Sequence, residues 1–284
     1  MPRRHPDWIK VRFPGSSNYL RLKGILRQHN LHTVCEEARC PNIGECWENN
    51  TATFLLLGDT CTRGCRFCAI GKGKPQPLNG EEPHNVGEVV KELGLKHIVV
   101  TSVDRDDLPD GGSRHLAQTV FWIKTLSPGI RVELLIPDFK GARPALETVV
   151  RSGIHVLNHN VETVPRLYRK VRPGSVYQRS LGVLKAAKEI RGDLLTKSGL
   201  MLGLGETGEE VLTTLKDLRE IGCDILTLGQ YLQPSPNQLR VERYLAPTEF
   251  EALKGEAMKL GFRHVESGPL VRSSYHAWSH VTPS

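Results

Sequence analysis

Short apolar runs alternate along most of the chain with longer stretches whose apolar residues recur at helical spacing. Six such runs predict strands at 54–58, 97–101, 132–137, 155–158, 199–203 and 225–228. The stretches between and after them predict helices at 86–93, 114–126, 142–151, 176–190, 209–221 and 248–260. Regular alternation of strand and helix indicates parallel βαβ units.

Six βα units predict an α/β fold, a partial (β/α)6 barrel of the TIM type with an extension at each end. A doubly wound open sheet is the alternative on the pattern alone. In barrels of this kind the functional groups lie at the C-terminal ends of the strands. The residues that follow each predicted strand are therefore the candidates for the site.

Three cysteines follow the first predicted strand with the spacing CxxxCxxC, namely Cys61, Cys65 and Cys68. Iron–sulfur cubes are usually held by four thiolates. Three local cysteines leave one iron open, and an open position suits catalysis. Structural zinc is the alternative, but it expects paired CxxC motifs and a fourth Cys or His nearby. In this loop Gly64 allows a tight turn, since glycine can adopt positive φ at little cost, and Phe67 would shield the cluster face from water.

A second group of three cysteines, with the spacing CxxxxCxxxxxC, precedes the barrel pattern. Its members are Cys35, Cys40 and Cys46, and Pro41 and Gly44 bend the segment between them. Three ligands in one segment predict a second cluster whose fourth ligand is distant or external. A cluster that only relays electrons is the alternative role.

Composition narrows the class of protein. Seven cysteines, six of them in two tight groups, favour metal binding in a reducing cytosol over a disulfide framework, with Cys223 a buried small hydrophobe. No apolar run reaches the ~18 residues of a membrane span, and no signal-peptide core is present. The net charge of +7 favours an acidic partner. Nucleic acid is not expected, since the chain lacks a concentrated basic block or a binding signature.

Six short motifs resemble those of the lipoyl synthase family, in the radical S-adenosylmethionine superfamily. They are LHTVCEEA at 31–38, CPN at 40–42, GECW at 44–47, FCA at 67–69, TSVDRDDL at 101–108 and RSSYHA at 272–277. The resemblance covers most of the chain, and it implies the same partial barrel. It divides the chain into an N-terminal extension with the auxiliary cysteines at 1–50, the barrel at 51–261, and a tail at 262–284 that closes the auxiliary cluster.

The cofactors that the resemblance implies are two 4Fe–4S clusters and S-adenosylmethionine. The catalytic cluster would be held by Cys61, Cys65 and Cys68, with S-adenosylmethionine on its open iron. The auxiliary cluster would be held by Cys35, Cys40, Cys46 and Ser273. Because a serine ligand must lose its proton to bind iron, it is a weaker ligand than a thiolate at neutral pH. It therefore suits a cluster that is taken apart.

Four further residues are candidate contacts of S-adenosylmethionine. Thr101 begins the polar segment after the second strand, which the resemblance places near the methionine amino group. Asn160 and Glu162 have acceptors for ribose hydroxyls, with His159 between them predicted to pack beneath the strand end. Arg172, in a basic run, could bind a carboxylate. The alternatives are a loop of solvated charges after the second strand and a solvated basic surface at 169–172.

The resemblance implies insertion of two sulfurs, at carbons six and eight of an octanoyl chain on a lysine of a lipoyl carrier protein or lipoyl domain. A deoxyadenosyl radical would abstract each hydrogen, and the auxiliary cluster would donate the sulfur. A low-potential donor of the ferredoxin or flavodoxin type would supply electrons in the cytoplasm. The alternatives are another radical S-adenosylmethionine enzyme, whose second cluster transfers electrons or anchors substrate, and a non-enzymatic zinc module.

Overall fold

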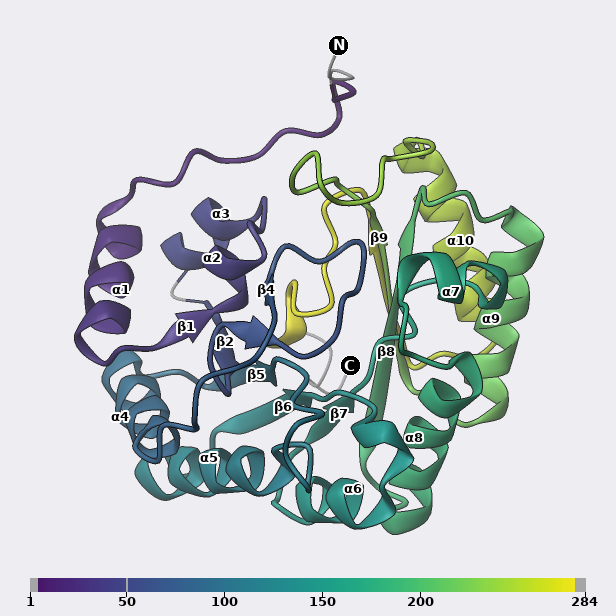
Figure 1. The fold of residues 1–284 in the computed structure, drawn as a ribbon. Coiled ribbons are helices and arrows are strands. Elements are labelled where there is room, and N and C mark those ends of the chain that lie inside the picture. Colours follow the sequence, from purple (N-terminus) through teal and green to yellow (C-terminus); the bar gives the residue numbers. More distant parts are fainter. Residues whose placement is uncertain (1–4, 50, 279–284) are drawn as a thin grey trace.

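The computed structural model describes residues 5–49 and 51–278. Its centre is an eight-stranded sheet in the order β1-β2-β5-β6-β7-β8-β9-β10 (Figure 1). β1 is antiparallel to β2, and every other neighbouring pair is parallel. The strands are β1 (His32–Thr33), β2 (Thr53–Leu56), β5 (His97–Ser102), β6 (Arg131–Leu135), β7 (Val156–Asn158), β8 (Leu195–Leu202), β9 (Ile225–Gln230) and β10 (His264–Gly268).

The six predicted strands all form, as β2 and β5 to β9. They curve into an arc with the helices on its outer side (Figure 1), which confirms the partial barrel rather than the doubly wound sheet. β10 adds a seventh parallel strand that the apolar pattern did not predict, because Val265 is its only apolar residue. It lies within 262–284, the range predicted as a tail.

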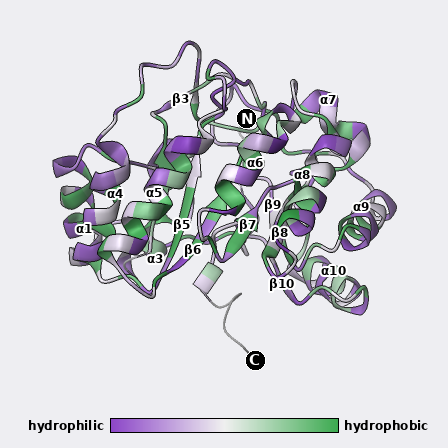
Figure 2. Cartoon of the chain, turned by 90° about the horizontal axis from the view of Figure 1, so that it is seen from below, coloured by the Kyte–Doolittle hydropathy of each residue, from purple (hydrophilic) through white to green (hydrophobic). Residues whose placement is uncertain are grey.

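The outer layer consists of six longer helices. They are α4 (Glu82–Leu93), α5 (Ser113–Leu126), α6 (Arg143–Val150), α8 (Tyr177–Ile190), α9 (Gly208–Glu220) and α10 (Pro247–Lys259). Their bounds lie within a few residues of those predicted. Each buries one apolar stripe, such as Val86, Val89 and Val90 of α4, against the sheet. Figure 2 shows the strands as an apolar layer beneath helices that carry polar outer faces. Short turns η1 (Phe139–Gly141), η2 (Pro165–Leu167) and α7 (Tyr168–Val171) lie in the connections.

The N-terminal extension packs beside the first barrel strand. α1 (Ser17–Gln28) is capped at its N-terminus by Ser16, whose hydroxyl accepts from the Tyr19 amide. The helix buries Leu22 and Leu26. α2 (Val34–Glu37) and α3 (Ile43–Glu48) follow β1. Trp47 of α3 is fully buried, and its ring lies 4.9 Å from that of Tyr19. The pairing of β1 with β2 therefore ties this cysteine-bearing segment to the barrel wall.

Candidate functional site

The CxxxCxxC loop (61–68) lies at the mouth of the barrel, directly after β2. It is flanked by a two-stranded sheet of β3 (Thr60–Cys61) and β4 (Gly71–Lys72). The Thr62 hydroxyl donates to Asp104 O at 2.8 Å, and the Cys68 amide donates to Cys65 O at 3.2 Å. The chain turns here as Gly64 allows, but the glycines with positive φ in this structure do not include Gly64. Hydrogen bonds to the loop after β5, rather than a left-handed glycine, shape this turn.

Arg63 anchors the loop to the barrel. Its side chain is 5% exposed and donates to both carboxylate oxygens of Asp106, at 2.8 and 2.9 Å. It also donates to Asp138 at 2.6 Å and lies 3.4 Å from an oxygen of Asp104. Burial alone would raise the pKa of Asp138, but the hydrogen bonds and charge of Arg63 outweigh burial and lower that pKa to about 2. Arg63 therefore joins the loop to the segments after β5 and β6.

The three thiols of the loop lie close enough together for their charges to affect one another's pKa. Burial raises the pKa of Cys61 to about 11 and that of Cys68 to about 12, and it also raises the pKa of Cys65. The charges of Cys61 and Cys65 raise the pKa of Cys68 further. Thiolates gathered here need a nearby positive charge, such as iron, to be the stable form.

A cavity of about 160 Å³, the loop cavity, opens beside these cysteines. Its lining includes five residues with a buried polar atom that has no hydrogen-bond partner in the described part of the chain. The atoms are Ser102 Oγ, Asp104 Oδ1, His159 Nε2, Asn160 Oδ1 and Arg172 Nε. Of these, Asp104 Oδ1 is ion-paired with Arg63 Nε at 3.4 Å, although it accepts no hydrogen bond. Buried polar atoms are normally paired. Unpaired acceptors beside a guanidinium therefore indicate a site for a polar ligand that carries both a cation and an anion.

His159 adds a neutral acceptor to this cavity. Its Nδ1 lies 2.8 Å from Ile136 O, so that nitrogen donates and Nε2 accepts. Burial lowers the pKa of His159 to about 4, which keeps the ring neutral at physiological pH. The ring does pack beneath the strand end, as predicted, but it also lines the cavity.

The predicted contacts Thr101, Asn160, Glu162 and Arg172 all line the loop cavity. The Thr101 hydroxyl donates to Leu135 O at 2.9 Å, so its proton is already used within the sheet. Asn160 Nδ2 donates to Glu162 Oε1 at 3.1 Å, and the side-chain oxygen Oδ1 of Asn160 has no hydrogen-bond partner. Burial raises the pKa of Glu162, and its φ of 66° places it in the strained left-handed region.

Arg172 is the buried member of its basic run. Its Nη1 donates to Asn160 O at 2.8 Å and to Val161 O at 3.3 Å, and the side chain lies against the Tyr168 ring. Arg169 and Lys170 are exposed instead. The alternative of a solvated surface therefore holds for those two residues and not for Arg172.

The N-terminal cysteine segment (35–46) faces a second cavity of about 450 Å³, the central cavity. Cys35 and Cys40 line it, and burial raises the pKa of Cys35 and of Cys46 to about 12. The charges of Cys35 and Cys40 raise the pKa of Cys46 as well, so the three thiols are close neighbours. Cys68, Phe67 and Ser273 line the same cavity. The central cavity thus joins both cysteine groups and the C-terminal tail.

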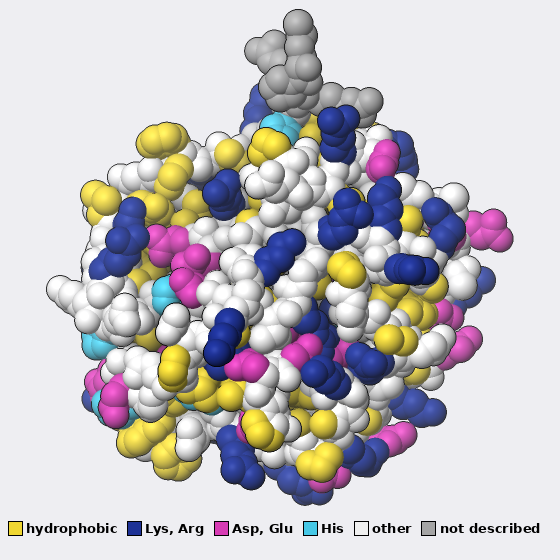
Figure 3. All heavy atoms as spheres, viewed as in Figure 1, with side chains coloured by type: hydrophobic (Ala, Val, Ile, Leu, Met, Phe, Trp, Pro, Cys, Tyr) yellow, Lys and Arg dark blue, Asp and Glu magenta, His cyan; other side chains and the backbone are white. Residues whose placement is uncertain are grey.

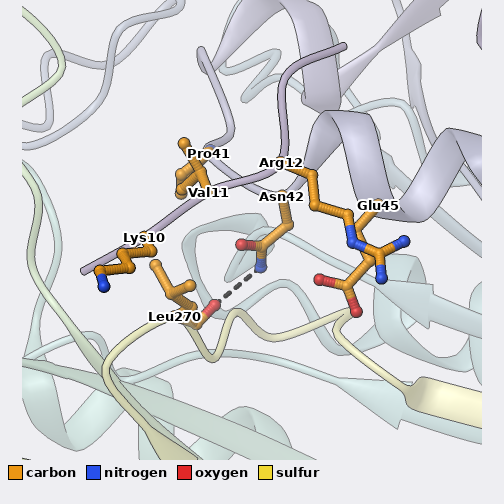
Figure 4. A pocket seen from close by; sticks show the side chains of 7 residues that line it. All are labelled: Lys10, Val11, Arg12, Pro41, Asn42, Glu45 and Leu270. Atoms are coloured by element: carbon orange, nitrogen blue, oxygen red, sulfur yellow. Dashed lines mark hydrogen bonds between the residues drawn. The ribbon is translucent and has the colours of Figure 1, made fainter. Parts of the chain in front are cut away.

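The tail is fastened to the N-terminal cysteine segment on both sides of Ser273. Before it, Asn42 Nδ2 donates to Leu270 O at 2.7 Å, beside a pocket of about 260 Å³ that the N-terminal arm crosses (Figure 4). After it, the Tyr275 hydroxyl donates to Glu45 Oε1 at 3.1 Å. These two contacts place Ser273 in the central cavity, where Asn158 Nδ2 donates to its hydroxyl at 3.4 Å.

Arg272 lines the central cavity near Cys40 and Glu162. Burial raises the pKa of Cys40 and the charge of Arg272 opposes that rise, while burial lowers the pKa of the guanidinium itself. Its Nη1 donates to Val271 O at 2.7 Å. A guanidinium in this place would offset the negative charge of thiolates in the N-terminal cysteine segment.

The seventh cysteine, Cys223, lies apart from both groups. It is fully buried beside β8 and β9, as predicted, and all seven cysteines are free. Within residues 5–49 and 51–278, no helix is both long and apolar enough to span a bilayer. The same residues hold no group of three or more His, Cys, Asp or Glu side chains that could bind a single metal ion.

The sequence matches the model of the radical SAM superfamily over residues 55–218, and that of the N-terminal domain of lipoyl synthase over residues 2–40. It is 55% identical over 278 residues to lipoyl synthase of Roseiflexus sp. (strain RS-1), covering 98% of this chain and 92% of the relative. Identity to lipoyl synthase of Rubrobacter xylanophilus is 56% over 272 residues, covering 96% and 85%. The chain belongs to the lipoyl synthase family.

As a member of this family, the chain is a sulfur-inserting radical S-adenosylmethionine enzyme. Its cofactors are S-adenosylmethionine and 4Fe–4S clusters. Solved structures agree on the fold. Methylornithine synthase (PylB) superposes with a TM-score of 0.57 at 16% identity, over 89% of this chain and 82% of that one. SuiB of Streptococcus suis, bound to S-adenosylmethionine, superposes with a TM-score of 0.60 at 11% identity, over 95% of this chain and 60% of SuiB.

The residues present fit the cofactors of a lipoyl synthase. Both groups of three thiols contribute to one central cavity, through Cys35 and Cys40 of one group and Cys68 of the other. The thiols of a cube bind separate irons rather than one shared ion. The unpaired acceptors and the guanidinium of the loop cavity suit the amino, carboxylate and ribose groups of S-adenosylmethionine. Sequence reasoning missed Arg63, Asp104, Asn158 and Arg272. Arg272 stood inside a recognised motif, but its place near Cys40 and Glu162 has no sequence signal.

Proposed function

We propose that this lipoyl synthase inserts two sulfurs, at carbons six and eight, into an octanoyl chain on a lysine of a lipoyl carrier domain. When bound, the first cluster with S-adenosylmethionine supplies the hydrogen-abstracting radical, and the second cluster supplies the sulfur. The central cavity carries this proposal, because cysteines of both groups and Ser273 of the tail line the same cavity.

The chain's own residues bind and orient the reactants. Cys61, Cys65 and Cys68 hold the first cluster, and Arg63 fixes their loop against the barrel. In the loop cavity, Asp104 and Asn160 offer acceptors to the amino group and ribose of S-adenosylmethionine, while Arg172 Nε faces its carboxylate. We assign Thr101 and Glu162 to the same ligand as wall residues.

The second cluster is assigned to Cys35, Cys40, Cys46 and Ser273. Arg272 offsets the charge of the thiolates, and the Asn42 and Glu45 contacts hold the tail across the mouth. Apolar side chains line much of the central cavity and suit an octanoyl chain, among them Val34, Leu55, Ile70, Leu135, Leu200, Met201 and Leu232. Phe67 lines both cavities, so it lies where the proposed S-adenosylmethionine site meets the proposed octanoyl site.

The domain division follows from this assignment. Residues 1–50 carry the auxiliary cysteines, 51–261 form the barrel, and 262–284 bring the last barrel strand and Ser273. A ferredoxin-type or flavodoxin-type donor provides electrons, and the thiol-rich site favours the reducing cytoplasm.

Iron content tests the two cluster sites. We expect about eight irons in the anaerobically isolated protein and about four in a Cys35/Cys40/Cys46→Ala variant, because each group of cysteines holds one cube. Iron and sulfide assays with Mössbauer spectra measure this. The matched control is Cys223→Ala, which removes a buried cysteine outside both groups and should keep about eight irons. Four irons in both the parent and the triple variant would contradict the second site.

The face around the mouth suits an acidic carrier domain. Lys and Arg side chains are spread across it in Figure 3. Arg39, Arg66 and Lys72, which lie in or next to the cysteine loops in the sequence, are exposed. We expect carrier binding to weaken as salt rises and to fall several-fold in Arg39→Glu and Lys72→Glu, because exposed charges steer association. Titration calorimetry at two ionic strengths measures this. Lys216→Glu, on the outer helix α9, is the control and should bind as the parent does.

A further inference from the structure

A charged layer lies inside the barrel, next to the central cavity. Lys197 of β8 and Glu133 of β6 are both fully buried, and Lys197 Nζ lies 2.9 and 3.1 Å from the carboxylate oxygens. Side chains two residues apart on a strand share a face. Gly199 and Leu135, two residues further along each strand, line the central cavity. The ion pair therefore faces the barrel interior, one step below the cavity.

Asn158 connects this ion pair to the tail. It ends β7, in register with Leu135 on one side and Lys197 on the other, and it is fully buried. Its Nδ2 donates to Glu133 Oε1 at 2.9 Å and to the Ser273 hydroxyl at 3.4 Å. Because the carboxylate only accepts, it fixes which end of the Asn158 amide carries the nitrogen. The second N–H is thereby aimed at Ser273.

Ser273 belongs to a short span that is pinned at both ends. The Asn42–Leu270 and Glu45–Tyr275 hydrogen bonds hold the flanking residues on the N-terminal cysteine segment. Between them the Ser273 hydroxyl faces the opposite wall, where β7 ends. The hydroxyl can exchange partners across the cavity by a local change, without release of the whole tail.

We propose that Asn158 is a positioning residue that holds the Ser273 hydroxyl at the barrel wall whenever Ser273 is not a cluster ligand. The Glu133–Lys197 pair orients the Asn158 amide for this contact. The inference rests on the proposed function, in which Ser273 is a displaceable ligand. It gives the buried ion pair beneath the cavity a role. The Glu133–Lys197 pair holds the Asn158 amide in one orientation, and Asn158 in turn holds Ser273 of the tail.

Hydrogen exchange of the tail tests this in the full chain. The background is the Cys35/Cys40/Cys46→Ala variant with its first cluster loaded, where Ser273 has no auxiliary cluster to bind. Asn158→Leu is expected to speed amide exchange in peptides covering 270–277 by about two- to tenfold, the range of one net hydrogen bond. Ser273→Ala should give the same increase, and the double variant no more than either.

Two outcomes would overturn the proposal. One is unchanged exchange in Ser273→Ala, which removes the contact without touching the ion pair and so covers the case in which Asn158→Leu fails to fold. The other is additive increases in the double variant. Ser274→Ala, the neighbouring serine, is the control and should leave exchange unchanged. Iron content tests the proposed function separately, so the two can fail independently.

Discussion

Replacement of Lys197 by methionine is expected to destabilise the protein by about 3–5 kcal/mol, because it leaves the Glu133 carboxylate buried without its cation. For a chain of 284 residues that corresponds to a melting temperature lower by roughly 5–8 °C. Thermal unfolding of parent and variant at matched iron content measures the difference. Because both charges are fully buried, water cannot take the place of the missing cation, and the loss should exceed that from breaking any exposed ion pair.

The double variant Lys197→Met/Glu133→Leu separates charge from packing. Replacing both members of a buried ion pair with apolar residues of similar size is often close to neutral. We expect it to recover most of the lost stability. A double variant as unstable as Lys197→Met would show that the cost comes from packing, and the ion-pair explanation would then be wrong.

Arg63→Met is expected to cost about 3 kcal/mol and to lower the iron content of the first cluster site. Asp138 is fully buried and would lose its shortest cationic contact, at 2.6 Å, although Arg179 would remain 3.2 Å away. Because Arg63 also ties the CxxxCxxC loop to Asp106, its loss frees the loop. Thermal unfolding and iron assays measure the two effects. Arg179→Met is the control: its side chain is 30% exposed, so about 1 kcal/mol or less is expected.

The same pair gives the stability a defined dependence on pH. The folded pKa of Asp138, about 2, lies below its ordinary value of 3.8. A group of this kind stabilises the fold fully above about pH 4 and loses that contribution as the pH falls toward 2. In Arg63→Met the pKa of Asp138 should rise, so acid unfolding should begin at a higher pH. An unchanged acid midpoint would contradict the assigned role of Arg63.

The periodic pattern predicted the barrel because each strand–helix unit is a local feature of the sequence. β10 was missed because it has a single apolar residue and is held by its parallel pairing with β9. β8 was predicted to begin at 199, since Lys197 interrupts the apolar run, although the strand extends back to Leu195. In the sequence a lysine indicates an exposed position, and Lys197 is buried only because Glu133 on another strand pairs with it.

The candidate site divides in the same way. Cysteine spacing predicted both groups of thiols, because ligands of one cube lie close along the chain. Contacts that join distant segments have no such signal. Arg63 and Asp138 are 75 residues apart, and Asn158 and Ser273 are 115 apart. The turn at Gly64 is a related case, since contacts with the loop after β5 shape it and Gly64 does not adopt positive φ.

The fastening of the tail to the N-terminal segment imposes an order on biosynthesis. Asn42 and Leu270 are 228 residues apart, so the contact between them can form only after Leu270 has been synthesised. Arg63 and its acidic partner Asp138 both precede Leu270, so the contact that anchors the CxxxCxxC loop can form before the tail is fastened. A chain that stops before Leu270 can therefore still make the Arg63 contact but cannot fasten the tail to the N-terminal segment.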